Sequence, residues 1–119
     1  MLKSKKLNKI KGSYNEAVAF NYIKKNLKYR ILATNYKNKI GEIDIIALDK
    51  TTIVFIEVKS RETTSFGLPR EAVDQNKQHK IKLVATLFLK ENNLYEECKV
   101  RFDICEIIDK EINYLINAF

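Results

Sequence analysis

Two neighbouring segments that are apolar at almost every position constrain the fold of this chain most. They are residues 42–48 (Glu-Ile-Asp-Ile-Ile-Ala-Leu) and 52–60 (Thr-Ile-Val-Phe-Ile-Glu-Val-Lys-Ser). Successive side chains of a strand point to opposite faces of its sheet, so both segments are apolar on two faces. Strands of this kind belong to a sheet that is covered on both sides. Residues 49–51 make a short turn between them, and the pair predicts a central β-hairpin.

The remaining elements follow from periodicity and end signals. Strict alternation in the first strand of the hairpin places Ile43, Ile45 and Ala47 on one face and Ile46 and Leu48 on the other. Ser13, with Glu16 three residues later, reads as a capping box that starts a first helix. Pro69 suits the first position of a second helix, which runs to about Glu91. Further strands are expected at residues 29–35, 100–108 and 112–119, with a polar, basic loop at 36–40.

These elements predict an α/β protein with the order α-β-β-β-α-β-β, a mixed β-sheet flanked by helices. Residues 1–11 are expected to be a flexible basic N-terminal arm, and residues 12–119 a single domain, which suits a chain of 119 residues. No segment approaches the roughly 18 apolar residues that a membrane span requires. The basic N-terminus lacks the apolar stretch of a signal peptide, so we expect a cytoplasmic protein without a membrane partner.

Charge and cysteine content narrow the function classes. The formal net charge of +7 favours polyanionic partners such as nucleic acid. Lysine is abundant along the whole chain, however, so charge alone does not separate nucleic-acid binding from a compositional bias. Cys98 and Cys105 are the two cysteines and His79 is the one histidine, and their spacing does not predict a structural zinc site.

Three charged residues interrupt the hairpin. If Leu48 pairs with Ile53, the indices of paired residues sum to a constant and Asp44 faces Glu57 across the two strands. Lys59 lies two residues beyond Glu57 and so shares its face. A slip of one residue would put the two carboxylates on opposite faces, so this arrangement depends on the register.

Two opposed carboxylates repel each other unless a cation lies between them. Mg²⁺ prefers hard oxygen ligands, so Asp44, Glu57 and the backbone carbonyl of Val58 are the candidate metal ligands. A bound ion would polarise a phosphodiester and activate a water, while Lys59 would orient that water or neutralise charge on the phosphate. The alternative is that these side chains form only ion pairs at an exposed strand end.

Glu16 is a fourth candidate. It lies on the same helical stripe as Phe20, Ile23 and Leu27, which is the stripe expected to face the sheet. From there its carboxylate could reach the hairpin as a further ligand for metal or water. The alternative is that Glu16 is only the second half of the capping box.

Several spaced motifs resemble one known family. They are the segments Gly12–Ala17, Gly41–Asp44, Val54–Lys59 with Arg61, Phe66-Gly67 with Pro69, Glu71–Val73 with Lys77, Arg101–Asp103 and Asn117–Phe119. Together they resemble the restriction-endonuclease-like superfamily and, more closely, the YraN family, which is related to archaeal Holliday junction resolvases. The resemblance covers residues 12–119. The chain has Asn15 where the family pattern has glycine.

The resemblance implies a restriction-endonuclease-like fold. It also implies metal ligation by Asp44 and Glu57, with Lys59 as the catalytic lysine and Glu16 as a further catalytic carboxylate. Candidate phosphate contacts are Arg61, next to the catalytic strand, Lys77 on the second helix, and the loop residues Lys37 and Lys39. For these four, a solvated or snorkelling surface charge is the alternative. Arg101 and Asp103 are expected to pair structurally with each other's neighbours, and a catalytic role is the alternative.

We therefore expect a Mg²⁺- or Mn²⁺-dependent DNA endonuclease that is selective for branched or otherwise structured DNA. Resolvase relatives act as dimers because a four-way junction requires two symmetric cuts, so a homodimer is expected. The alternative is a non-catalytic nucleic-acid-binding module that works with a protein partner in DNA repair or recombination. A third hypothesis is a scaffold whose hairpin charges form only ion pairs.

Overall fold

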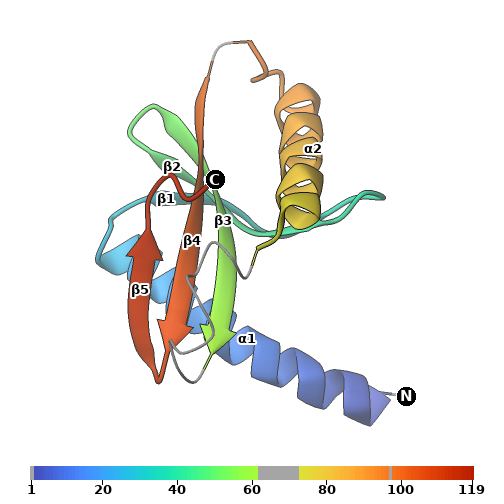
Figure 1. The fold of residues 1–119 in the computed structure, drawn as a ribbon, viewed down its shortest axis with the longest axis vertical. Helices are drawn as coiled ribbons and strands as arrows, with labels where there is room; N and C mark the ends of the chain where they lie inside the picture. Colours follow the sequence, from blue (N-terminus) through green and yellow to red (C-terminus); the bar gives the residue numbers. More distant parts are fainter. Residues whose placement is uncertain (1, 62–72, 97) are drawn as a thin grey trace.

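The computed structural model describes the backbone of residues 2–61, 73–96 and 98–119, and side chains from Tyr14 onward. Its elements are α1 (Leu2–Lys25), β1 (Arg30–Lys37), β2 (Glu42–Asp49), β3 (Thr52–Arg61), α2 (Gln75–Glu91), β4 (Lys99–Ile108) and β5 (Glu111–Leu115). The strands form one sheet in the order β1-β2-β3-β4-β5 (Figure 1). β3 and β4 are parallel and the other pairs are antiparallel. The predicted element order and the mixed sheet are confirmed.

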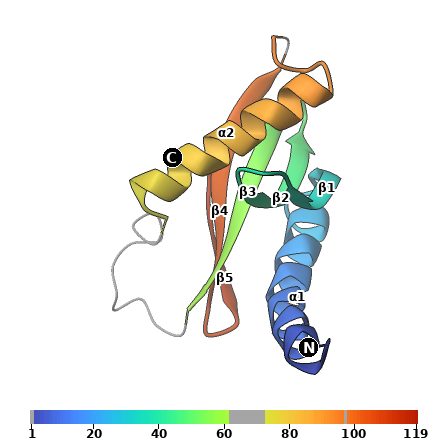
Figure 2. The same cartoon turned by 90° about the vertical axis from the view of Figure 1, so that its right-hand side faces the viewer.

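The two helices cover opposite faces of the sheet, so the protein has three layers (Figure 2). One apolar cluster lies between the sheet and α2 and includes Ile46, Ile53, Phe55, Ile81, Val84 and Phe88. The other lies between the sheet and α1 and includes Ala19, Ile23, Ile45, Ala47, Val54, Ile56 and Cys105. β2 and β3 contribute to both clusters, which is why their sequences are apolar on both faces.

The register of the central hairpin is the one that the sequence predicts. Leu48 pairs with Ile53, and the ladder continues to the pair Ile45 and Ile56. The turn is tighter than expected, because Asp49 also pairs with Thr52 and leaves two residues in the loop. Lys50 in that loop has a positive φ of 56°, which hairpin turns of two residues require.

The alternation predicted for β2 is wrong at its N-terminal end. Ile43 packs in the cluster under α2, whereas Ile45 packs in the cluster under α1. The neighbouring β1 carries Asn35 with a positive φ of 51°, a conformation that asparagine adopts more readily than most residues. We attribute the change of face to this irregularity, which lies opposite Asp44 between the pairs Thr34–Ile45 and Tyr36–Ile43.

Both predicted helix starts are wrong. α1 begins at Leu2 and not at Ser13, because the lysine- and leucine-rich residues before Ser13 are good helix formers. The backbone of residues 2–11 is thus helical, while the flexibility of this arm stays a prediction. α2 begins at Gln75, after an N-cap in which the Asp74 side chain accepts the amide of Lys77. Pro69 lies outside the described residues.

The strand boundaries differ less from the prediction. β1 extends to Lys37, into the segment expected to be a loop, and β5 ends at Leu115 rather than continuing to the C-terminus. In the part of the chain that the structure describes, neither helix is long and apolar enough to cross a membrane.

Candidate active site

Asp44 and Glu57 lie where β2 and β3 stop pairing. The last ladder pair is Ile45 with Ile56, and these two acidic residues come next on either strand. Beyond that point the Asp44 side chain takes the place of a backbone acceptor, because its Oδ2 accepts a hydrogen bond of 2.8 Å from the backbone amide of Val58. The separation of the strands therefore turns Asp44 toward β3 and brings its carboxylate beside Glu57.

The two carboxyl groups perturb each other. Burial, the largest cause, acts together with the hydrogen bond and the charge of Glu57 to raise the pKa of Asp44 to about 8. The Glu57 side chain is 7% exposed. Near neutral pH, Asp44 therefore holds a proton that it donates toward Glu57. The predicted approach of these two carboxyl groups is confirmed.

Two lysines approach Glu57 from different elements. Lys77 Nζ, from the first turn of α2, lies 2.7 Å from Glu57 Oε2, and Lys59 Nζ, from β3 itself, lies 4.0 Å from the same atom. Burial, followed by the adjacent ammonium of Lys77, lowers the pKa of Lys59. Burial is the largest single influence on Lys77 and acts to lower its pKa, but the hydrogen bonds with Glu57 and Lys59 and the nearby acidic groups together outweigh burial, so the pKa of Lys77 is raised.

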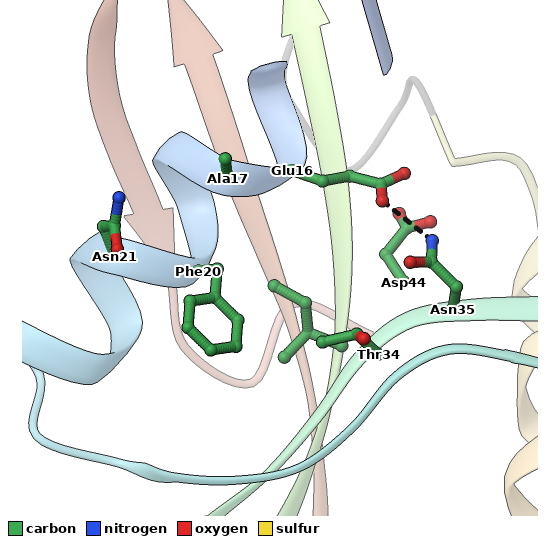
Figure 3. A pocket seen from close by; sticks show the side chains of 8 residues that line it. Glu16, Ala17, Phe20, Asn21, Thr34, Asn35 and Asp44 are labelled. Atoms are coloured by element: carbon green, nitrogen blue, oxygen red, sulfur yellow. Dashed lines mark hydrogen bonds between the residues drawn. The ribbon is translucent and has the colours of Figure 1, made fainter. Parts of the chain in front are cut away.

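Glu16 reaches the site from the opposite helix. A cavity of about 280 Å³ between α1 and the sheet is lined by Glu16, Ala17, Phe20, Asn21, Thr34, Asn35, Asp44 and Ile45. In it, Glu16 Oε1 accepts a hydrogen bond of 2.8 Å from Asn35 Nδ2, with the Asp44 carboxyl alongside (Figure 3). The negative charge of Glu16 makes a smaller contribution to the raised pKa of Asp44. Because α1 continues through Ser13, Glu16 does not belong to a capping box.

The donor set fits a hard divalent cation in part. Asp44 and Glu57 share a proton, and a cation in place of that proton would reduce the repulsion between their two carboxylates. Carboxylate oxygens are the ligands that Mg²⁺ prefers. Among the described residues, no group of three or more His, Cys, Asp or Glu side chains is placed to hold a metal ion. Waters, a backbone carbonyl and a phosphate would have to complete the coordination, as is common for Mg²⁺. Ligation by the Val58 carbonyl stays a prediction.

The four predicted phosphate contacts have different surroundings. Lys77 lies inside the site against Glu57. The Arg61 guanidinium lies 2.6 Å from Glu106, whose side chain is fully buried. Lys37, at the end of β1, and Lys39, in the following turn, are exposed. Contact of these four side chains with nucleic acid stays a prediction.

Comparison with known proteins places the chain in a family. The model of the family described as "Uncharacterised protein family UPF0102" matches residues 15–107. The chain belongs to this family, which is the YraN family that its motifs resemble. It is 45% identical to a UPF0102 protein of Caldanaerobacter subterraneus subsp. tengcongensis, over 97% of this chain and 99% of that protein. It is 47% identical to a UPF0102 protein of Clostridioides difficile, over 94% of this chain and 98% of that protein.

Two features of this UPF0102 protein are not predictable from its sequence pattern. Asn35 falls at the end of a predicted strand, yet it has a positive φ opposite Asp44 and its side chain donates to Glu16. A lysine is unusual on an apolar stripe, which singles out Lys77, but its partner Glu57 is 20 residues away in sequence and cannot be inferred from spacing.

Proposed function

We propose that this protein is a divalent-metal-dependent endonuclease that hydrolyses phosphodiester bonds in DNA, with branched or structured DNA as the preferred substrate. The observation that carries the proposal is the placement of the Asp44 and Glu57 carboxyls together, next to the Lys59 ammonium, where β2 and β3 separate. The net charge of +7 is consistent with a polyanionic substrate. The resemblance to resolvases adds DNA as the substrate and Mg²⁺ or Mn²⁺ as the ion.

Each residue then has a role that its position allows. Asp44 and Glu57 would hold the ion, which, when bound, supplies Lewis-acid polarisation of the phosphodiester and a water of lowered pKa. Asp44 releases its proton to become a ligand, and the Val58 amide keeps its carboxylate oriented. Lys59 stabilises the negative charge that develops on the phosphate. Glu16, on the far side of Asp44, is placed to accept a hydrogen bond from a water in the cavity.

The proposal is tested by cleavage assays. Purified protein is incubated with linear, single-stranded and four-way-junction DNA in Mg²⁺, Mn²⁺ or EDTA, together with Asp44→Asn and Lys59→Ala. We expect cutting that requires metal and falls at least about a hundredfold in each variant, the usual scale for a residue that acts on the reacting group. The control is Lys50→Ala, an exposed lysine in the turn at the other end of β3, which should cut like wild type.

A second function is favoured by the lysine contacts. Lys77 and Lys59 balance the charge of Glu57 without any metal, as a site that does not turn over would require. In this alternative the protein is a nucleic-acid-binding module that acts with a protein partner in DNA repair or recombination. DNA binding that persists in Asp44→Asn, with no cutting by wild type under any condition, would support the module and refute the enzyme.

Two symmetric cuts in a four-way junction require two active sites, so the endonuclease proposal includes a homodimer. Size-exclusion chromatography with light-scattering detection, with and without junction DNA, measures the number of protein chains per particle directly. A single chain bound per junction would contradict this part of the proposal and leave single-cut activity intact.

A further inference from the structure

Glu57 has a closer cation than the lysine of its own strand. Its Oε2 lies 2.7 Å from Lys77 Nζ and 4.0 Å from Lys59 Nζ, and its side chain is 7% exposed. A carboxylate that is so well buried is strongly destabilising unless a cation accompanies it. In the structure, Lys77 supplies that cation.

Glu57 would have to offer the same oxygen, Oε2, to a bound metal ion. A direct contact of 2.7 Å between the ammonium and Oε2 occupies a coordination direction of Glu57, and two positive charges at one carboxylate repel each other. A divalent ion and the Lys77 ammonium therefore compete for Glu57. Lys59, on the same strand as Glu57, is farther from the oxygen and need not move.

Lys77 is also the lysine that can leave. Its side chain is 43% exposed, compared with 26% for Lys59, so its ammonium can reach water by rotation of its own side chain. Its backbone is held, because its amide donates to Asp74 Oδ1 at 2.8 Å in the N-cap of α2. The released ammonium would remain beside the N-terminus of a helix, where the backbone amides also favour an anion.

We propose that Lys77 is a two-position lysine that takes the place of the metal ion at Glu57 in the metal-free protein and binds a substrate phosphate once the ion has displaced it. This inference rests on the proposed nuclease function. It makes metal binding and DNA binding cooperative, since each favours the outward position of the same side chain. It also means that wild-type affinity for metal is lower than the two carboxylates alone would give.

The experiment is a calorimetric titration of the DNA-free protein with Mn²⁺. Lys77→Met, which keeps an unbranched side chain one atom shorter and without the charge, is expected to bind Mn²⁺ about tenfold more tightly than wild type, the order expected when a half-buried ion pair no longer competes. Lys80→Met, at an exposed position of the same helix, is the matched control and should bind like wild type. A second readout is the affinity for a short phosphorothioate duplex, which Mn²⁺ should strengthen in wild type and strengthen less in Lys77→Met.

Each result has a definite meaning. Tighter Mn²⁺ binding by Lys77→Met alone supports the inference. Unchanged or weaker binding by that variant, with wild type binding Mn²⁺ normally, overturns the inference and leaves the proposed function standing. Failure of both wild type and Lys77→Met to bind Mn²⁺ overturns both. If Lys77→Met does not fold, Lys77→Gln, which can still donate to Glu57, provides the same comparison.

Discussion

The central hairpin has a buried charge cluster at each end, and the two clusters are balanced differently. At the turn end, Arg101 and Asp103 of β4 meet Asp49, Tyr29 and Tyr114; we call this the Arg101 cluster. At the open end, Asp44 and Glu57 meet Glu16 and the lysines 59 and 77; this is the carboxylate site. Each cluster includes one aspartate of β2, Asp49 in the Arg101 cluster and Asp44 in the carboxylate site, and each combines acidic with basic side chains.

In the Arg101 cluster, every oxygen of the buried acid has partners. Asp103 is fully buried, and its Oδ1 accepts from Arg101 Nε at 2.9 Å and from the Asn117 amide at 2.8 Å. Its Oδ2 accepts from the Arg101 guanidinium at 3.0 Å and from the Tyr114 hydroxyl at 2.6 Å. Both oxygens of Asp103 already accept two hydrogen bonds each, so this carboxylate offers no further acceptor position to a ligand. We therefore regard its charge as structural.

In the carboxylate site, by contrast, acids face acids. Asp44 keeps a proton because burial and the neighbouring Glu57 raise its pKa. The Glu57 carboxylate is paired with Lys77, which belongs to α2 and not to the sheet. The comparison teaches that burial of charge alone does not identify a functional site. Acidic groups that the fold holds against one another are the informative feature.

The largest effect should come from breaking the Arg101 cluster. Arg101→Met leaves Asp103 as a buried carboxylate without its cation, and we expect the free energy of unfolding to fall by about 3–5 kcal/mol. Urea denaturation measures this loss. Lys99→Met, at an exposed position of the same strand, should change stability little. A loss below about 1 kcal/mol would mean that Tyr114 and the Asn117 amide suffice for Asp103.

The next effect concerns pH and belongs to the carboxylate site. The folded-state pKa of Asp44 is raised to about 8, so between its ordinary pKa of 3.8 and that value the folded protein holds a proton that the unfolded chain has lost. Stability therefore falls as pH rises through this window and is fully present only below it. Compared with Asp44→Asn, metal-free wild type should lose about 2–3 kcal/mol more between pH 5 and pH 7.

Denaturation of both proteins in EDTA at each pH measures the difference. Arg101 and Tyr114 should contribute nothing over this range, because the pKa values of both groups are raised and both stay protonated. Parallel stability curves for wild type and Asp44→Asn would show that Asp44 is already ionised at pH 5.

The carboxylate site is predictable from the sequence to a greater extent than the Arg101 cluster. Much of the carboxylate site follows from local rules: two strands that are apolar on both faces and a short turn fix the pairing of Leu48 with Ile53, and this register makes Asp44 and Glu57 the first residues beyond the end of the ladder. The Arg101 cluster joins β2, β4, β5 and the segment before β1. Its two central members share a strand face, but their other partners depend on tertiary packing.

Local signals failed where two of them competed. Pro69 and Asp74 are both good helix-start residues, and the side-chain bond from the Lys77 amide to Asp74 marks the actual start of α2. At α1, the capping box at Ser13 was overridden by helix-forming residues on its N-terminal side. The position of Lys77 against Glu57 follows from where α2 begins and packs, and is not encoded in any short motif.

A smaller effect should follow from removing one donor to Asp103. Tyr114→Phe deletes the hydroxyl that donates to Oδ2 at 2.6 Å, and the remaining donors of Arg101 and Asn117 keep the acid paired. We expect a loss of about 2 kcal/mol, the scale of a hydrogen bond to a charged group. Thermal or urea unfolding measures it, with Tyr95→Phe at an exposed position as the control. An equal loss in both variants would show that the effect comes from deleting a tyrosine hydroxyl in general and not from the hydrogen bond to Asp103.

The smallest effect separates the clusters by what they bind. Mg²⁺ at ten times its dissociation constant should raise the free energy of unfolding by about 1.4 kcal/mol, provided that it binds the folded state alone. Arg101→Met should keep this increment on its lower baseline, because the substitution leaves Asp44 and Glu57 in place at the other end of the hairpin. Asp44→Asn should lose the increment although its metal-free form is not destabilised. If Arg101→Met lost the increment and Asp44→Asn kept it, metal would bind at the turn end, and the close approach of two acidic groups would no longer distinguish the carboxylate site from the Arg101 cluster.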